Sequence, residues 1–114
     1  MAHRKQTSLI GLDQHSKDLV CDALVKLVLR ELEQAKKAIK NKSYLGGSIE
    51  LADAGDWALV LTDVANGSID NLQMLKDRVK SLHTGHEHIC WNLVAEIENS
   101  QSQNVNNGQS AHKS

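Results

Sequence analysis

Residues 83–90, His-Thr-Gly-His-Glu-His-Ile-Cys, bring together side chains of the types that bind metals. On a helix, His83, His86, Glu87 and Cys90 occupy positions i, i+3, i+4 and i+7 and therefore share one face. Imidazole, carboxylate and thiolate groups are ligands for zinc and other transition metals. These four residues are thus candidate ligands for Zn or Fe, and a symmetry-related helix could complete the set. The alternative is that His86 is a hydrogen-bonded polar residue within an apolar seam.

Arg78 and His83 form a second pair with a recognisable spacing, since four residues separate them. This pair resembles the signature of HEPN-type ribonucleases, which are dimeric all-α proteins of similar size. The resemblance implies RNA cleavage at a dimer interface by Arg78 and His83. It covers these two residues only, and Val79 stands where that family usually has a polar residue. The alternative is a solvated Arg78 on a charged face with Asp77 and Lys80.

Four acidic residues form a third candidate, because they lie on one side of an expected helix. Such a face could coordinate a metal or dock a basic partner, but a solvated face is the commoner case. The residues are Glu50, Asp53, Asp56 and Asp63. The chain has no glycine-rich phosphate loop and no plausible Ser-His-Asp grouping.

The composition indicates that these residues are held by helices. The 114 residues include no Pro and no Phe, 40% are hydrophobic and the net charge is −1. Without Pro the commonest helix breaker is absent, and a core of Leu, Val, Ile and Ala suits helices at close range. We therefore expect one all-α domain, an antiparallel bundle of three long helices. The near-zero charge argues against a nucleic-acid binder.

The first expected helix begins at a cap formed by Asp13 or Ser16 and ends near Asn41. Two apolar rows run along it, and the second of them ends at Glu31. The first row consists of Cys21, Val25, Val28, Leu32, Ala35 and Ile39, and the second of Val20, Leu24 and Leu27. After a Gly46-Gly47 connection, a second helix capped by Ser48 should run to Asn66-Gly67.

The third expected helix starts at Ser68 and carries apolar residues at heptad spacing. Thr84-Gly85 interrupts it, and Thr84 with Glu87 matches a capping box, so the helix either runs unbroken or breaks there. Because the heptad phase continues through His86, we expect one helix, kinked at most. The domain organisation is then a flexible arm (1–12), a helical bundle (13–98) and a disordered polar tail (99–114).

Helices this unequal in length cannot cover one another, which predicts a homodimer. The alternative is a four-element monomer in which the end of the third helix folds back. The expected interaction surface lies on the first and third helices: Val20, Leu24, Leu27, Leu72, Leu75, Val79, Leu82, Ile89 and Leu93. Cys21 and Cys90 are expected to be reduced, and no membrane span or secretory signal is visible, which predicts a cytoplasmic protein. The leading hypothesis is a non-enzymatic regulatory protein that binds another, unidentified protein. Metal binding and ribonuclease activity are the alternatives.

Overall fold

The computed structural model describes the backbone of residues 11–113 and the side chains of residues 11–101. Its regular elements in this part of the chain are four α-helices: α2 (Gln14–Lys40), α3 (Tyr44–Ala65), α4 (Leu72–Lys80) and α5 (Glu87–Lys113). The all-α class predicted from the sequence is therefore confirmed. The prediction of three long helices is wrong, because the segment expected to form the third helix forms two helices, α4 and α5.

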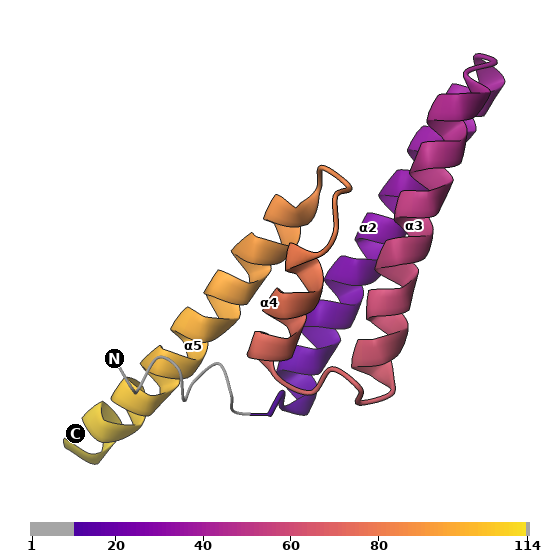
Figure 1. Ribbon diagram of the computed structural model, residues 1–114. Coiled ribbons are helices and arrows are strands. Elements are labelled where there is room, and N and C mark those ends of the chain that lie inside the picture. Colours follow the sequence, from indigo (N-terminus) through magenta and orange to yellow (C-terminus); the bar gives the residue numbers. More distant parts are fainter. Residues whose placement is uncertain (1–10, 114) are drawn as a thin grey trace.

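α2 and α3 form a long antiparallel hairpin, with α4 and α5 against one end of it (Figure 1). α2 begins where the sequence predicts, because the Asp13 side chain accepts a hydrogen bond of 2.7 Å from the Ser16 amide. The start of α3 at Tyr44 corrects the prediction of Ser48. Gly46 and Gly47 lie inside this helix rather than in a loop.

The close approach of α3 to α2 explains Gly47. A Cβ atom at this position would lie 2.6 Å from Cγ1 of Ile39, well inside van der Waals contact. The glycine therefore lets the two helices meet directly beside their turn. A pattern of paired glycines indicates a loop equally well, which is why the sequence placed the connection too late.

The break between α4 and α5 lies at Thr84-Gly85, and the prediction of one continuous helix is wrong. Gly85 has φ +85°, a left-handed conformation that costs little only for glycine. The Thr84 amide donates to the Glu87 carboxylate and the His86 amide donates to the Thr84 hydroxyl, so the predicted capping box does form. The chain thereby reverses, and α5 runs back beside α4 (Figure 1).

One apolar core joins all four helices. It contains the second row of α2, Trp57 on α3, and side chains from α4 and α5. Its members from α2 and α4 are Val20, Leu24, Leu27, Leu72, Leu75 and Val79, all at most 2% exposed. These six residues were predicted to face a partner. α5 covers them instead, because the helix break lets it fold back, and Leu82, Ile89 and Leu93 also pack against the core.

The first row of α2 is only partly covered. Ala35 is 1% exposed, and Cys21 and Val28 pack against the core, whereas Val25, Leu32 and Ile39 each keep 41% of their surface exposed. A helix with two neighbouring apolar rows gives no indication of which row faces its own chain.

The N-terminal end of the described chain is bonded to the segment before α4. The Leu12 amide donates a hydrogen bond of 2.7 Å to the Asp70 carbonyl, while residues 1–10 of the predicted arm lie outside the described part. The backbone of α5 continues as a helix to Lys113, through the segment whose composition predicts a disordered tail. The prediction for that segment in solution stays a prediction.

Candidate functional site

Glu31 is the one acidic residue at a buried position of α2. It continues the row Val20, Leu24 and Leu27, and its side chain is 0% exposed. One carboxylate oxygen, Oε1, contacts Nδ1 of His86. The other, Oε2, is buried and has no hydrogen-bond partner among the described side chains and backbone. A buried carboxylate with an unsatisfied oxygen is costly, so this atom demands a proton, a cation or a bound group.

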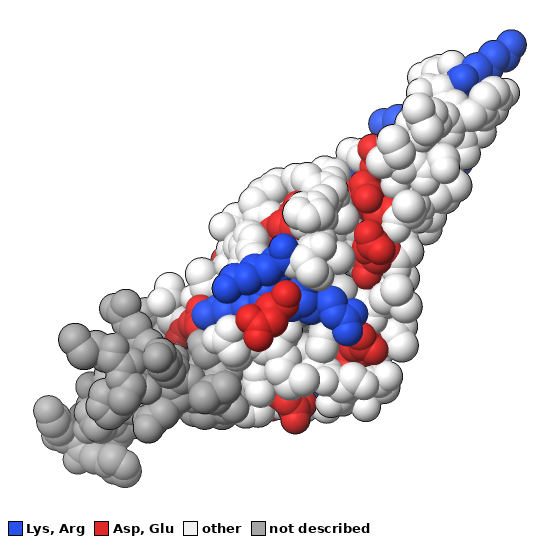
Figure 2. Space-filling model, viewed as in Figure 1, with Lys and Arg blue, Asp and Glu red and all other residues white. Residues whose placement is uncertain are grey.

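Two carboxylates from α3 lie beside Glu31. Glu50 and Asp53 are three residues apart and so share a face of that helix, and both are half-buried. Carboxylate oxygens of Glu31, Glu50 and Asp53 all lie within 4.8 Å of one another. Figure 2 shows acidic side chains gathered along the α2–α3 hairpin. The antiparallel hairpin thus brings together three acids that are up to 22 positions apart in the sequence.

His86 reaches this cluster from the loop between α4 and α5. Its backbone amide is held by the Thr84 hydroxyl at 3.2 Å, and its ring bonds to Glu31. The left-handed Gly85 immediately before it turns the chain toward the hairpin. The break in the third expected helix is therefore what places an imidazole against a buried carboxylate.

The surroundings of Glu31 and Asp53 disfavour negative charge. Burial raises the pKa of Glu31 to about 7, the Glu50 carboxyl adds to the rise because it is close enough to share a proton with Glu31, and His86 opposes it. Burial also raises the pKa of Asp53, as do the negative charges of Glu50, Asp56 and Glu87. Concentrated carboxylates whose ionisation is disfavoured are a common preparation for a cation, which removes their repulsion when it binds.

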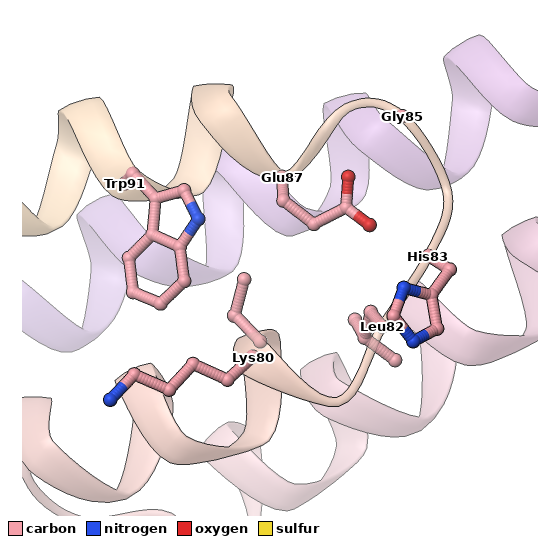
Figure 3. A pocket seen from close by; sticks show the side chains of 7 residues that line it. Lys80, Leu82, His83, Gly85, Glu87 and Trp91 are labelled. Atoms are coloured by element: carbon pink, nitrogen blue, oxygen red, sulfur yellow. The ribbon is translucent and has the colours of Figure 1, made fainter.

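An open hollow of about 570 Å³ lies at the loop between α4 and α5 (Figure 3). Gly85 and Glu87, the two neighbours of His86, line it. Lys80 from α4 and Trp91 from α5 extend across it from opposite sides, and His83 lies near the loop. The hollow therefore combines the cation of Lys80, the imidazole of His83 and the aromatic surface of Trp91. It lies at the loop that also carries His86.

The four predicted metal ligands do not come together. His83 is exposed in the loop, Glu87 caps the start of α5, and Cys90 is buried in the apolar core. Burial also raises the pKa of the Cys90 thiol to about 11, which disfavours the thiolate that a metal needs. Of that set, His86 is the residue that bonds to a member of the carboxylate cluster.

The Arg78–His83 pair is also separated. Arg78 lies near the end of α4 and forms an ion pair with Asp63 of α3, whereas His83 lies in the loop. The pair with Asp63 gives Arg78 a structural role in holding α4 against the hairpin. No contact between Arg78 and His83 is present among the described side chains.

Glu31 is the member of the candidate site that the sequence does not single out. It ends an apolar row, and a carboxylate in such a row is itself a signal. Glu50 and Asp53 belong to the acidic face for which the sequence predicts metal binding as one use. No local pattern indicates that this face meets Glu31, because that contact depends on the hairpin register.

No protein-family model matches the chain, and no curated protein or solved structure is significantly similar to it. Among the described helices, none has the length and apolar character needed to cross a membrane.

Proposed function

We propose that the protein binds a divalent cation of the Mg²⁺ or Mn²⁺ class at Glu31, Glu50 and Asp53. The observation that carries this proposal is the buried carboxylate of Glu31. Its Oε2 has no hydrogen-bond partner among the described residues, and carboxylate oxygens of Glu31, Glu50 and Asp53 lie within 4.8 Å of one another. Carboxylate oxygens suit these hard cations, whereas zinc and iron favour sites richer in imidazole and thiolate. We therefore propose an oxygen site in place of the Zn or Fe site that the sequence predicts.

The ligand that such a cation would recruit carries phosphate. Mg²⁺ in proteins is commonly held by one or two carboxylates, and substrate phosphates and waters complete its octahedron. Lys80 in the adjacent hollow supplies a positive charge for phosphate, and Trp91 supplies a flat apolar surface for an attached ring. The reaction class that fits is metal-assisted hydrolysis of a phosphate ester or anhydride, with the cation polarising the phosphoryl oxygen and binding water.

Cation binding is tested by calorimetric titration of Mg²⁺ and Mn²⁺ into the full chain. We expect saturable binding that Glu31→Gln weakens by at least about tenfold, as loss of one carboxylate ligand should. Glu33→Gln is the matched control, because Glu33 is an exposed acid on the same helix. Absence of binding to the wild type, or equal binding by both variants, would contradict the proposal.

Hydrolysis is tested separately by measuring phosphate and pyrophosphate release from nucleoside triphosphates, nucleotide sugars and simple phosphate esters. We expect cation-dependent turnover of at least one class that Glu31→Gln abolishes and Glu33→Gln preserves. A protein that binds the cation and turns over none of these would restrict the function to cation binding.

A second candidate function is the non-enzymatic interaction protein that the sequence predicts. The observation in its favour is the number of large apolar side chains left exposed on α2 and α3, including Leu29, Leu45 and Leu59 at 59–77%. Its test is affinity capture from the native host with the wild type and with Leu32→Glu in parallel. A partner lost by the variant supports this function, and a partner that both proteins retain would place the interaction elsewhere.

A further inference from the structure

One side of the α2–α3 hairpin is left uncovered by α4 and α5 along its length. The buried positions of α2 include Leu24 and Glu31, and the next residues, Val25 and Leu32, are 41% exposed. One residue later on an α-helix means about 100° further around it. The row Val25, Leu32 and Ile39, at steps of seven, therefore runs along the side of α2 that α4 and α5 leave uncovered.

α3 continues the same surface. Tyr44 and Leu51 are also seven residues apart and are 64% and 46% exposed. Gly55 follows the buried Ala54 by one residue, as Val25 follows Leu24. In each helix the exposed row is rotated by about 100°, in the direction of the chain, from the residues that face the other helix. Because both helices are right-handed and they run antiparallel, these two rotations place both rows on the same side of the hairpin. We call this surface the outer face: Val25, Leu32 and Ile39 of α2 with Tyr44, Leu51 and Gly55 of α3.

The outer face lacks charge across the whole of α3. This helix contains no Lys or Arg, and its four acids lie on the side that carries the carboxylate cluster. On α2 the same side of the hairpin does carry charges, because Asp18 lies seven residues before Val25 and Lys36 lies between Leu32 and Ile39. The α3 halves of two identical copies can face one another, because no like charges then oppose one another there.

Gly55 is not required by close packing within the described part of the chain. A Cβ atom at this position would meet nothing within 4 Å, and a glycine inside a helix costs about 1 kcal/mol relative to alanine. Ala52 and Ala58 flank it on nearby turns of the helix. Small residues in the middle of an exposed helix face allow another helix to approach closely, which accounts for a glycine that the chain itself does not require.

We propose that the outer face binds the same face of a second copy of this chain, so that two hairpins form a four-helix bundle. α3 has 22 residues and is thus about 33 Å long, and two helices side by side are about 20 Å wide. The contact would bury about 660 Å² per copy, or roughly 1,300 Å² in total, which lies within the range of stable complexes. Face-to-face pairing about a twofold axis closes the assembly at two copies.

This inference rests on the second proposed function, for which it names the partner, and it is independent of the cation site. The dimer it describes also differs from the one predicted from the sequence, because the residues expected at that interface lie in the core. The outer face lies on the opposite side of the hairpin from α5.

The test is the molar mass of the full chain in solution, measured by light scattering over a range of concentrations. We expect a dimer that Leu32→Glu shifts toward the monomer, raising the dimer dissociation constant by at least about 100-fold. Met74→Glu is the matched control, since Met74 on α4 has the same 41% exposure. We expect it to leave the dimer intact.

A second variant guards against simple misfolding. Gly55→Gln places its side chain into open space in the single chain and improves helix propensity, so the monomer should fold at least as stably as the wild type. It should nevertheless weaken the dimer, because the added side chain blocks the approach of the second helix. A monomeric wild type, or a dimer that survives both Leu32→Glu and Gly55→Gln, would overturn the inference.

The results also distinguish self-association from binding of a different partner and from cation binding. A monomeric protein that still captures a different partner through Leu32 would refute self-association and retain the interaction function. Removal of divalent cations with a chelator should leave the dimer unchanged, because the outer face contains none of the three carboxylates.

Discussion

The ring of His86 bonds through Nδ1 to a carboxylate oxygen of Glu31, a residue 55 positions earlier in the chain. The imidazole comes from the loop between α4 and α5, and the carboxylate comes from a buried position of α2. This contact fixes the orientation of the Glu31 carboxylate, which also has an oxygen within 4.8 Å of carboxylate oxygens of Glu50 and Asp53. A partner that orients a ligand in this way tunes a metal site without being its principal ligand.

Replacing His86 by alanine should therefore weaken cation binding without abolishing it. We expect a loss of affinity of about 10- to 100-fold, the usual effect of removing a group that orients a ligand. His88→Ala is the control, because His88 is an exposed histidine two residues away. Calorimetric titration with Mn²⁺ gives the affinities, and an affinity equal to that of His88→Ala would show that Glu31 needs no such support.

The pH dependence of stability should report on Glu31. Its pKa in the folded protein, about 7, is raised from the 4.5 of an ordinary glutamate, so the folded state holds a proton that the unfolded state has lost between these values. Stability of the cation-free protein must then fall as the pH rises through this window. We expect the melting temperature to be higher at pH 5.5 than at pH 8, and Glu31→Gln to reduce this difference.

The stabilisation of the protein by a bound cation should depend on pH in the opposite direction. A cation requires ionised carboxylates, so added Mg²⁺ or Mn²⁺ should raise the melting temperature more at pH 8 than at pH 5.5. Differential scanning calorimetry at both pH values measures this effect. A cation-induced shift that is larger at pH 5.5, or that persists in Glu31→Gln, would contradict the assignment of Glu31 as a ligand.

Much of the fold could be predicted from the sequence, because it depends on local signals. The absence of Pro, the cap at Asp13 and the long apolar rows define the all-α class and the start of α2. The capping box at Thr84 and Glu87 was also visible. Its consequence was not, because the heptad pattern continued through His86 and favoured an unbroken helix. The capping box indicated a break at this point and the heptad pattern indicated a continuous helix. Local sequence could not decide between the two.

The candidate site was less predictable, because it depends on tertiary register. His86 was singled out, and Glu50 and Asp53 were noted as acids. Only the pairing of α2 with α3 brings Glu31 to them, and that pairing is fixed by the close approach at Gly47. Which row of α2 faces inward likewise depends on where α5 lies.

The reversal at Gly85 should be sensitive to substitution. Its φ of +85° is strained for any residue with a Cβ, so Gly85→Ala should destabilise the protein by roughly 1 kcal/mol. Gly55→Ala is the matched change inside a helix and should instead be neutral or stabilising by up to about 1 kcal/mol. Urea unfolding of both variants measures the difference. Equal effects would mean that the left-handed turn is not required.

The two cysteines should differ in reactivity. Cys90 is 1% exposed in the core, and burial raises the pKa of its thiol to about 11, so hardly any thiolate exists at pH 8. Burial also raises the pKa of Cys21, but this residue lies half-buried on the side of α2 next to Val25. A disulfide-exchange reagent at pH 8 should therefore modify one thiol per chain rapidly and the second only after unfolding.

Substitution of each cysteine assigns the two phases. Cys21→Ser should remove the rapid phase, and Cys90→Ser should remove the slow one. Rapid modification of Cys90 in the Cys21→Ser variant would show that α5 separates readily from the core, because only such an opening exposes the thiol. Since α5 also covers Val20, Leu24 and Leu27, that opening would make the apolar surface predicted from the sequence available to a partner.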